Sequence, residues 1–149
     1  MKSTRTLIVH PTSYVRSMVI EALKAYDITD VFSVATGAEV LHLLEHQPID
    51  WIITVFDLGE NINVLKLINL VKTERKLRHC RISLFYDPEL ESEYLTTAFA
   101  LGLYSSHINN FVNEDVQASM DELMSLEELH QSEPSLVSGH YFRQHLLSQ

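Results

Sequence analysis

Four short apolar segments, rich in branched and aromatic side chains, recur along the chain at residues 6–10, 31–35, 51–56 and 82–86, and a fifth with a weaker pattern lies at residues 103–108. Each is flanked by proline, glycine, asparagine or aspartate, which interrupt regular structure, so each is typical of a strand. Residues 51–56 are almost wholly apolar or β-branched. That composition predicts a central strand buried on both faces.

The segments between these strands carry apolar residues at helical spacing. We expect helices from about residue 12 to 26, from the Thr36-Gly37 turn to about 46, from 64 to 71, from 90 to 101 and from Asn113 to about 129. Gly102 is suited to end the fourth helix, and a hydroxyl of Thr12 or Ser13 to cap the first rather than to hold an anion. Strand and helix alternate five times, which predicts an α/β fold with a parallel, doubly wound sheet.

The composition agrees with one globular domain, residues 1–129, followed by a linker-like tail, residues 130–149, with a short helical stub. The chain has 149 residues, 46% hydrophobic and 21% charged, and no apolar run exceeds four residues. No transmembrane helix is therefore expected, and the N-terminus lacks the apolar core of a signal peptide, so we expect a cytoplasmic protein. Such a tail is typical of a chain that continues into a further domain.

Charge divides the chain into two unlike halves. The formal net charge is -9, from 11 Lys and Arg against 20 Asp and Glu. Residues 1–81 hold ten basic and nine acidic side chains, whereas residues 82–149 hold one and eleven. A protein with this net negative charge is repelled by nucleic acid. The acidic half favours instead a protein partner with a basic surface.

Three sequence segments, TLIVHPTSYVRSMVIEAL, PIDWIITVFDL and AFALGLYSSHINNF, resemble the receiver domain of response regulators. They match its opening strand and helix, its central strand, and its fourth helix with the fifth strand and following turn. The resemblance covers roughly residues 5–129. It implies a flavodoxin-like (βα)5 fold with a five-stranded parallel sheet and a role in two-component signal transduction.

The same resemblance shows that the phosphorylation residues have been replaced. His10 and Pro11 stand where a receiver has two acidic Mg²⁺ ligands, and Val55 stands where it has the phospho-accepting aspartate. The closing hydroxyl residue of the fourth strand falls on Tyr86 or Asp87. The remaining family positions, a lysine, the proline after it and an aromatic switch residue, fall on Asn109, Asn110 and Ser106.

Aspartyl phosphorylation needs a carboxylate nucleophile, a hard cation and a positive partner for the phosphoryl oxygens. None of these stands at its usual position, so the chain resembles a pseudo-receiver: no enzyme, without catalytic residues, cofactor or metal. We expect a phosphorylation-independent module that acts through protein–protein contacts. The alternative is a small-molecule or metal sensor that uses the strand-end pocket near His10 and Asn109. A closed pocket favours the first hypothesis and an open, polar one the second.

Four further expectations concern side chains. Asp57 is interpreted as a loop or capping residue, with a substitute phosphoacceptor as the alternative. Cys80 lies among Arg78, His79 and Arg81, which would depress its thiol pKa, although the start of a buried strand is the favoured interpretation. The eight histidines are scattered and predict no metal site. The expected partner-binding face, on the fourth and fifth helices of a monomer or weak homodimer, comprises Glu89, Glu91, Glu93, Glu122 and Glu127.

Overall fold

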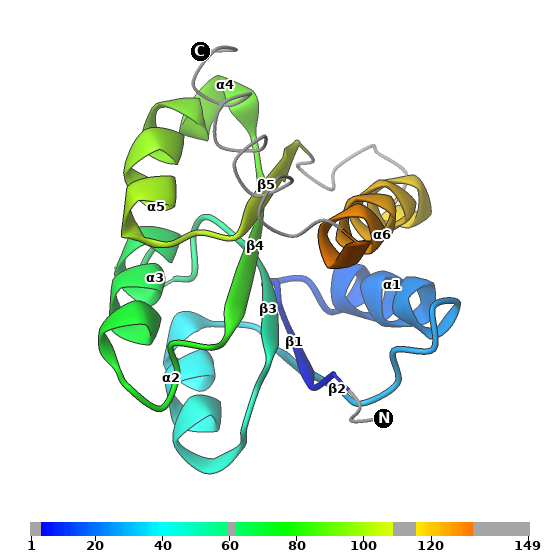
Figure 1. The fold of residues 1–149 in the computed structure, drawn as a ribbon, viewed down its shortest axis with the longest axis horizontal. Coiled ribbons are helices and arrows are strands. Elements are labelled where there is room, and N and C mark those ends of the chain that lie inside the picture. Colours follow the sequence, from blue (N-terminus) through cyan, green and yellow to red (C-terminus); the bar gives the residue numbers. More distant parts are fainter. Residues whose placement is uncertain (1–3, 60–61, 109–115, 133–149) are drawn as a thin grey trace.

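The computed structural model describes residues 4–59, 62–108 and 116–132. Five parallel strands form one sheet in the order β2-β1-β3-β4-β5 (Figure 1). The strands are β1 (Thr6–Val9), β2 (Val31–Val34), β3 (Trp51–Val55), β4 (Arg81–Tyr86) and β5 (Ser105–Ile108). The predicted flavodoxin-like α/β fold is confirmed, and β3 is the central strand, as its composition indicated.

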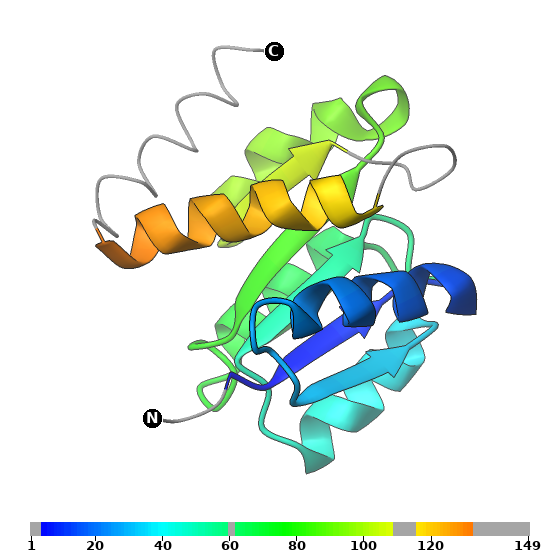
Figure 2. The same cartoon turned by 90° about the vertical axis from the view of Figure 1, so that its right-hand side faces the viewer.

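Helices cover both faces of this sheet. α1 (Ser13–Lys24) and α6 (Val116–Ser132) lie side by side on one face, as Figures 1 and 2 show. α2 (Gly37–His46) and α3 (Val64–Thr73) lie on the other face. They are joined there by a run of three short helices, α4 (Pro88–Glu91), η1 (Ser92–Tyr94) and α5 (Leu95–Leu101).

Alternate residues of the strands build two core layers. Leu7, Ile52 and Leu84 point into the layer beneath α2, α3 and α5. Ile8 and Ile53 point into the layer beneath α1 and α6. Because both faces are covered, the central strands are apolar in both directions, which explains why the sequence reads as short continuous apolar runs.

Side-chain caps begin α2 and α3. The Thr36 hydroxyl accepts from the Glu39 N–H (3.3 Å) and donates to the Glu39 carboxylate (3.2 Å), a reciprocal cap at the start of α2. Asn63 caps α3 by accepting from the Lys66 N–H (3.1 Å). The predicted hydroxyl cap of α1 is wrong, because Thr12 occupies the N-cap position without a side-chain capping bond.

The segment predicted as one helix over residues 90–101 is divided into three pieces. It begins earlier, at Pro88, and turns into a 3₁₀ helix at Ser92. The Ser92 hydroxyl donates to the Pro88 carbonyl (2.6 Å), and a side-chain bond of this kind competes with the regular backbone ladder. α5 ends at Leu101 as expected, followed by Gly102 at a φ of 120°.

Candidate functional site

The carboxyl ends of β1, β3 and β4 meet at one end of the sheet. The parallel register pairs Val9 with Thr54 and Val55 with Phe85. His10, which follows β1, is thereby brought next to the end of β3. Ligand sites in open parallel sheets lie at this end, and of the predicted pocket residues His10 and Val55 lie together there.

His10 is half-buried and is held by its own loop. Its Nδ1 accepts a hydrogen bond from the Thr12 N–H (3.0 Å), and its carbonyl oxygen accepts one from the Arg16 guanidinium (2.7 Å). Burial lowers the pKa of His10, which favours a neutral ring whose Nδ1 is an acceptor. His10 is thus a strand-end histidine whose ring is bonded to the backbone. Pro11 beside it is exposed.

Val55 lines a hollow of only about 10 Å³. That volume is at the lower limit for a single water molecule, so neither a phosphoryl group nor a hydrated cation fits into it. His10 and Thr54 are the polar residues among those described around it, and the others are apolar: Ile8, Val9, Val15, Val19, Ile53 and Phe85. The described part of the pocket is therefore too small for a ligand and largely apolar.

Asp57 lies in the loop after β3 and is exposed. Its carboxylate accepts a hydrogen bond from the Gly59 N–H (2.9 Å), and its backbone pairs with that of Asn63. A carboxylate that bonds the N–H two residues later stabilises a turn. The loop interpretation of Asp57 is thus confirmed.

Tyr86 and Asp87 end β4 without reaching the hollow around Val55. Tyr86 is buried in the opposite core layer, beneath α3 and α5, and burial raises the pKa of its hydroxyl. Asp87 caps α4 by accepting from the Glu89 N–H (3.0 Å). Neither residue lines the hollow, and Asn109 and Asn110 lie outside the described residues.

The predicted partner-binding face is present in part. Glu89, Glu93 and Glu122 are exposed, whereas Glu91 is partly buried and accepts a hydrogen bond from the Asp87 N–H (2.8 Å). Burial, and then the nearby Asp87 carboxylate, raise the pKa of Glu91. Three large apolar side chains are exposed in the same α4–η1–β5 region: Leu90 (71%), Tyr94 (37%) and Ile108 (59%).

The assignment of Glu127 to that face is wrong. Glu127 is only 4% exposed, and its carboxylate forms an ion pair with Arg81 at 2.8 Å. The Arg81 guanidinium lies 5.2 Å from the ring centres of both Trp51 and Tyr104. Burial, and then a hydrogen bond to Glu127, raise the pKa of Tyr104. This group fastens the C-terminal part of α6 to the amino ends of β3, β4 and β5.

A line of buried hydrogen bonds crosses the sheet beneath α6. The Trp51 indole donates to Ser83 (2.9 Å), whose hydroxyl meets that of Ser105 (2.8 Å), which in turn meets His107 Nε2 (3.0 Å). Sequence reasoning missed both this line and the Arg81–Glu127 pair. Ser83 among the apolar residues of β4, and the polar run Ser105-Ser106-His107 in β5, were the sequence signals for this line of hydrogen bonds.

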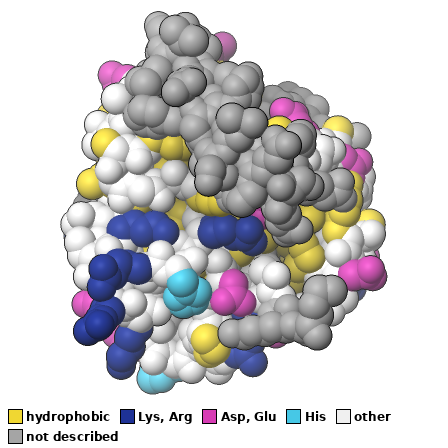
Figure 3. Space-filling view, in the orientation of Figure 1, with side chains coloured by type: hydrophobic (Ala, Val, Ile, Leu, Met, Phe, Trp, Pro, Cys, Tyr) yellow, Lys and Arg dark blue, Asp and Glu magenta, His cyan; other side chains and the backbone are white. Residues whose placement is uncertain are grey.

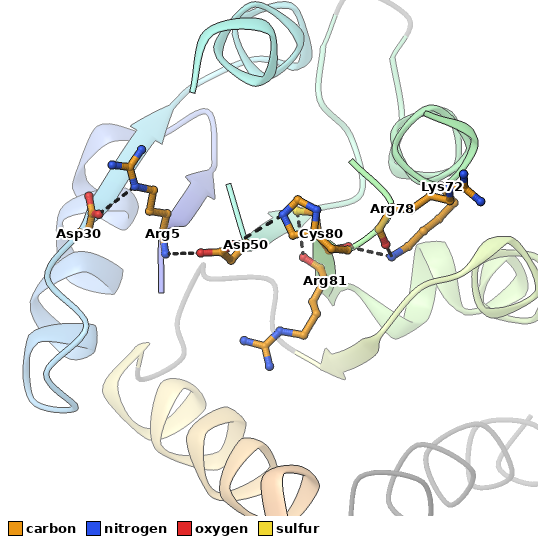
Figure 4. Close-up of polar contacts among 8 residues, drawn as sticks. Arg5, Asp30, Asp50, Lys72, Arg78, Cys80 and Arg81 are labelled. Atoms are coloured by element: carbon orange, nitrogen blue, oxygen red, sulfur yellow. Dashed lines mark hydrogen bonds and ion pairs between the residues drawn. The ribbon is translucent and has the colours of Figure 1, made fainter. Parts of the chain in front are cut away.

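Basic side chains gather over the connection between α3 and β4 (Figure 3). Residues 72–81 hold five Lys or Arg and one Glu, and Arg75, Lys76 and Arg78 are exposed. Lys72 fastens the connection by donating to the carbonyl oxygens of Arg78 (3.1 Å) and Cys80 (2.7 Å), as Figure 4 shows. The amino end of the sheet is thus cationic.

Cys80 is fully buried at the start of β4. Burial raises the pKa of its thiol to about 12, although the nearby Lys72 acts in the opposite direction. A depressed pKa, which the neighbouring cations in the sequence suggested, is therefore wrong. The favoured interpretation of Cys80 as a buried strand residue is confirmed, and it is no candidate nucleophile.

The geometry matches that of known receiver domains. A chemotaxis response regulator from Vibrio cholerae superposes with a TM-score of 0.68 at 18% identity, over 83% of this chain and 98% of that one. The chain has the receiver fold. A phosphorylated cyanobacterial phytochrome response regulator gives a TM-score of 0.69 at 14% identity, over 85% of this chain and 93% of that one.

A third receiver fold, the signal receiver domain of an HD-domain-containing protein from Pseudomonas fluorescens, gives a TM-score of 0.68 at 17% identity. It covers 89% of this chain and 100% of that one. No family model matches the chain, and no curated protein matches its sequence. Within the described residues, no helix has the length and apolar character needed to cross a membrane.

Proposed function

We propose that this chain is a pseudo-receiver: a non-catalytic signalling module that acts through phosphorylation-independent protein–protein contacts in a two-component-like pathway. The observation that carries the proposal is Val55 at the end of the central strand, beside a hollow of about 10 Å³. An aliphatic side chain supplies no nucleophile, and the neutral His10 and Pro11 supply no carboxylate for Mg²⁺.

The partner surface that we propose is the α4–η1–β5 region with the neighbouring acidic residues. Leu90, Tyr94 and Ile108 supply exposed apolar area, and Glu89 and Glu93 supply charge beside it. Apolar anchors within a polar rim are the usual anatomy of a protein interface. The carboxylates favour a partner with Lys or Arg at its rim, because complementary charge speeds association and excludes partners of like charge.

The alternative hypothesis, a sensor that binds a ligand in the strand-end pocket, receives no support from the described residues. A ligand pocket for a small molecule has a volume of about 300–1,000 Å³. The hollow between His10 and Val55 is smaller by more than an order of magnitude. We therefore place the function on the surface rather than in the pocket.

The first prediction is that acetyl phosphate with Mg²⁺ leaves the protein unmodified, because Val55 cannot accept a phosphoryl group. Intact mass spectrometry after incubation is the measurement, with an ordinary receiver treated in parallel as the positive control. For the same reason, amide NMR spectra recorded with and without Mg²⁺ and beryllofluoride should superimpose.

The variant Asp57→Asn distinguishes the remaining possibility. A phosphoryl adduct on the wild type that disappears in Asp57→Asn would make Asp57 the acceptor and overturn the proposal. We expect both proteins to keep their unmodified mass, since Asp57 is engaged in its own turn with Gly59.

A further inference from the structure

One exposed face of α2 brings His42, Glu45 and His46 together. One potential ligand atom from each lies within 4.8 Å of the others, and the two imidazole rings are 4.7 Å apart between centroids. None of the three side chains forms a hydrogen bond or ion pair with another residue in the described part of the chain. Their donor atoms are therefore free to turn toward a shared ion.

The backbone beneath these side chains is fixed before any ion binds. Residues 42 and 46 are four apart on one helix, so their side chains lie one turn apart on the same face. α2 is capped by Thr36 and anchored by the buried Val40 and Leu44. Binding would therefore require only the ordering of side-chain rotamers.

We propose that His42, Glu45 and His46 form a binding site for a divalent transition-metal ion, with Zn²⁺ as the representative. Imidazole nitrogens favour Zn²⁺, Cu²⁺ and Ni²⁺ over Mg²⁺ and Ca²⁺, which prefer sites built from oxygen ligands. Zn²⁺ bonds to nitrogen and carboxylate oxygen are about 2.0–2.2 Å long. The three donor atoms already lie within 4.8 Å of one another, so in the proposed site rotation about the exposed χ angles would bring them to that distance from the ion.

Three protein ligands leave one tetrahedral position of Zn²⁺ open. Glu45 also lines a hollow of about 480 Å³ between α2 and α3, together with Leu44, Leu70 and Lys76. The ion would lie at the rim of this hollow, where its open position accepts water or a side chain of a bound protein. The His-x-x-Glu-His spacing was the signal in the sequence, and it becomes informative once the segment is known to be helical.

Isothermal titration of Zn²⁺ into the full chain, produced without a polyhistidine tag, tests the site, with Mg²⁺ titrated in parallel. Zn²⁺ should bind and Mg²⁺ should not. Losing an outer-shell partner typically weakens metal binding about 10- to 100-fold, so losing a ligand in His42→Ala or His46→Ala should weaken it at least tenfold. Alanine favours helix, so both variants should fold.

His79→Ala is the matched control, because His79 is also exposed and lies beside a carboxylate, 3.5 Å from Asp50. It should bind Zn²⁺ as tightly as the wild type. NMR should also show Zn²⁺-dependent shifts of the His42 and His46 ring signals. Binding to the double variant His42→Ala/His46→Ala that is as tight as to the wild type would overturn the proposal, as would a wild type that binds no Zn²⁺.

Discussion

His10 and Val55 remove the electrostatic reason for binding Mg²⁺ at the strand ends. Carboxylates placed close together repel one another, and a divalent cation offsets that repulsion. Here burial lowers the pKa of His10, and Val55 carries no charge. The loop after β1 is instead held by hydrogen bonds from Thr12 and Arg16 to His10. These hydrogen bonds hold the loop at the end of β1.

The lowered pKa of His10 predicts a loss of stability in mild acid. Above the ordinary pKa of histidine, about 6.5, the ring is neutral in both the folded and the unfolded chain, so burying it costs no free energy of ionisation. Below it, the unfolded chain takes up a proton that the folded chain resists, so the free energy of unfolding falls as the pH drops. The variant His10→Asn keeps an acceptor for the Thr12 N–H and removes this titration. Urea unfolding at pH 7.5 and 5.5 should show a smaller loss for the variant.

The control is Tyr14→Asn, an exposed substitution in the same segment that leaves the His10 ring in place. Its loss of stability between the two pH values should equal that of the wild type. Equal losses for the wild type and His10→Asn would mean that burial of His10 does not resist protonation, contrary to the argument.

Cys80 illustrates what a single sequence can and cannot reveal about one side chain. The cations at Arg78, His79 and Arg81 are its neighbours along the chain, and their charge suggested a reactive thiol. Burial is the larger effect and raises the pKa of the thiol instead. The strand pattern that begins at residue 82 predicted burial correctly, because it reports the environment in space rather than along the chain.

α6 contains a charged residue at a position that the helical periodicity predicts to be buried. Over residues 116–127, where burial is described, its buried positions are Val116, Met120, Leu123 and Glu127, at intervals of four, three and four residues. The fourth member lies on the apolar stripe even though it is charged. Glutamate is usually exposed, and the wrong assignment of Glu127 to the partner-binding face followed from that general rule. The partner, Arg81, is 46 positions away in the sequence and is found only in the fold.

The Arg81–Glu127 pair predicts that Glu127→Gln destabilises the protein, because it leaves the guanidinium without its anion. Removing one partner of a fully buried pair costs about 3–5 kcal/mol. The Arg81 side chain is 27% exposed, so we expect a smaller loss of about 2 kcal/mol in the free energy of unfolding. Urea unfolding followed by the fluorescence of Trp51, the single tryptophan, measures it.

Glu122→Gln is the control for this prediction, since Glu122 is exposed on the same helix. Its effect should stay within about 0.5 kcal/mol, as is usual for surface substitutions. If the two variants proved equally stable, Arg81 would find sufficient compensation in water and in the rings of Trp51 and Tyr104, and the pair would not fasten α6.

At the scale of the molecule, the fold was predictable and much of the site was not. Five strand–helix repeats and the right-handed crossover rule leave few arrangements of a parallel sheet. The position of Val55 at the end of the central strand followed from the same pattern. The size of the hollow beside Val55, in contrast, depends on how Phe85 and Val15 pack around it, and a sequence holds no direct measure of that volume.

The two ends of the sheet also differ in charge. The connection between α3 and β4, at the amino ends of the strands, carries the exposed Arg75, Lys76 and Arg78. The α4–η1 segment, which follows the carboxyl end of β4, carries Glu89 and Glu93. Separated charges of this kind orient an approaching partner before contact, and salt weakens the effect. For the protein partner that we propose, the acidic end would act more through the sign of the partner's charge than through added affinity.

This arrangement predicts that two copies do not associate tightly through α4 and α6 at low salt. Such contact would bring Glu89, Glu93 and Glu122 of both copies together, and residues 82–149 offer only Arg143 as a basic side chain. Salt screens the repulsion over about 30 Å at 0.01 M and about 8 Å at 0.15 M, so any contact there should strengthen as salt is added. Sedimentation equilibrium at these two salt concentrations is the measurement.

Neutralising this face sharpens the test. The triple variant Glu89→Gln, Glu93→Gln and Glu122→Gln should associate at least as readily as the wild type, and its association should depend less on salt, because the repelling charges are gone. The control is the triple variant Glu21→Gln, Glu45→Gln and Glu74→Gln, which removes three exposed carboxylates elsewhere. Measured with a chelator present, it should keep the salt dependence of the wild type.

A dimer that is stable at low salt and whose cross-links join α4 and α6 of two copies would show that apolar contact through Leu90 and Tyr94 outweighs the repulsion. The acidic face would then be a homodimer interface rather than a site for a basic partner.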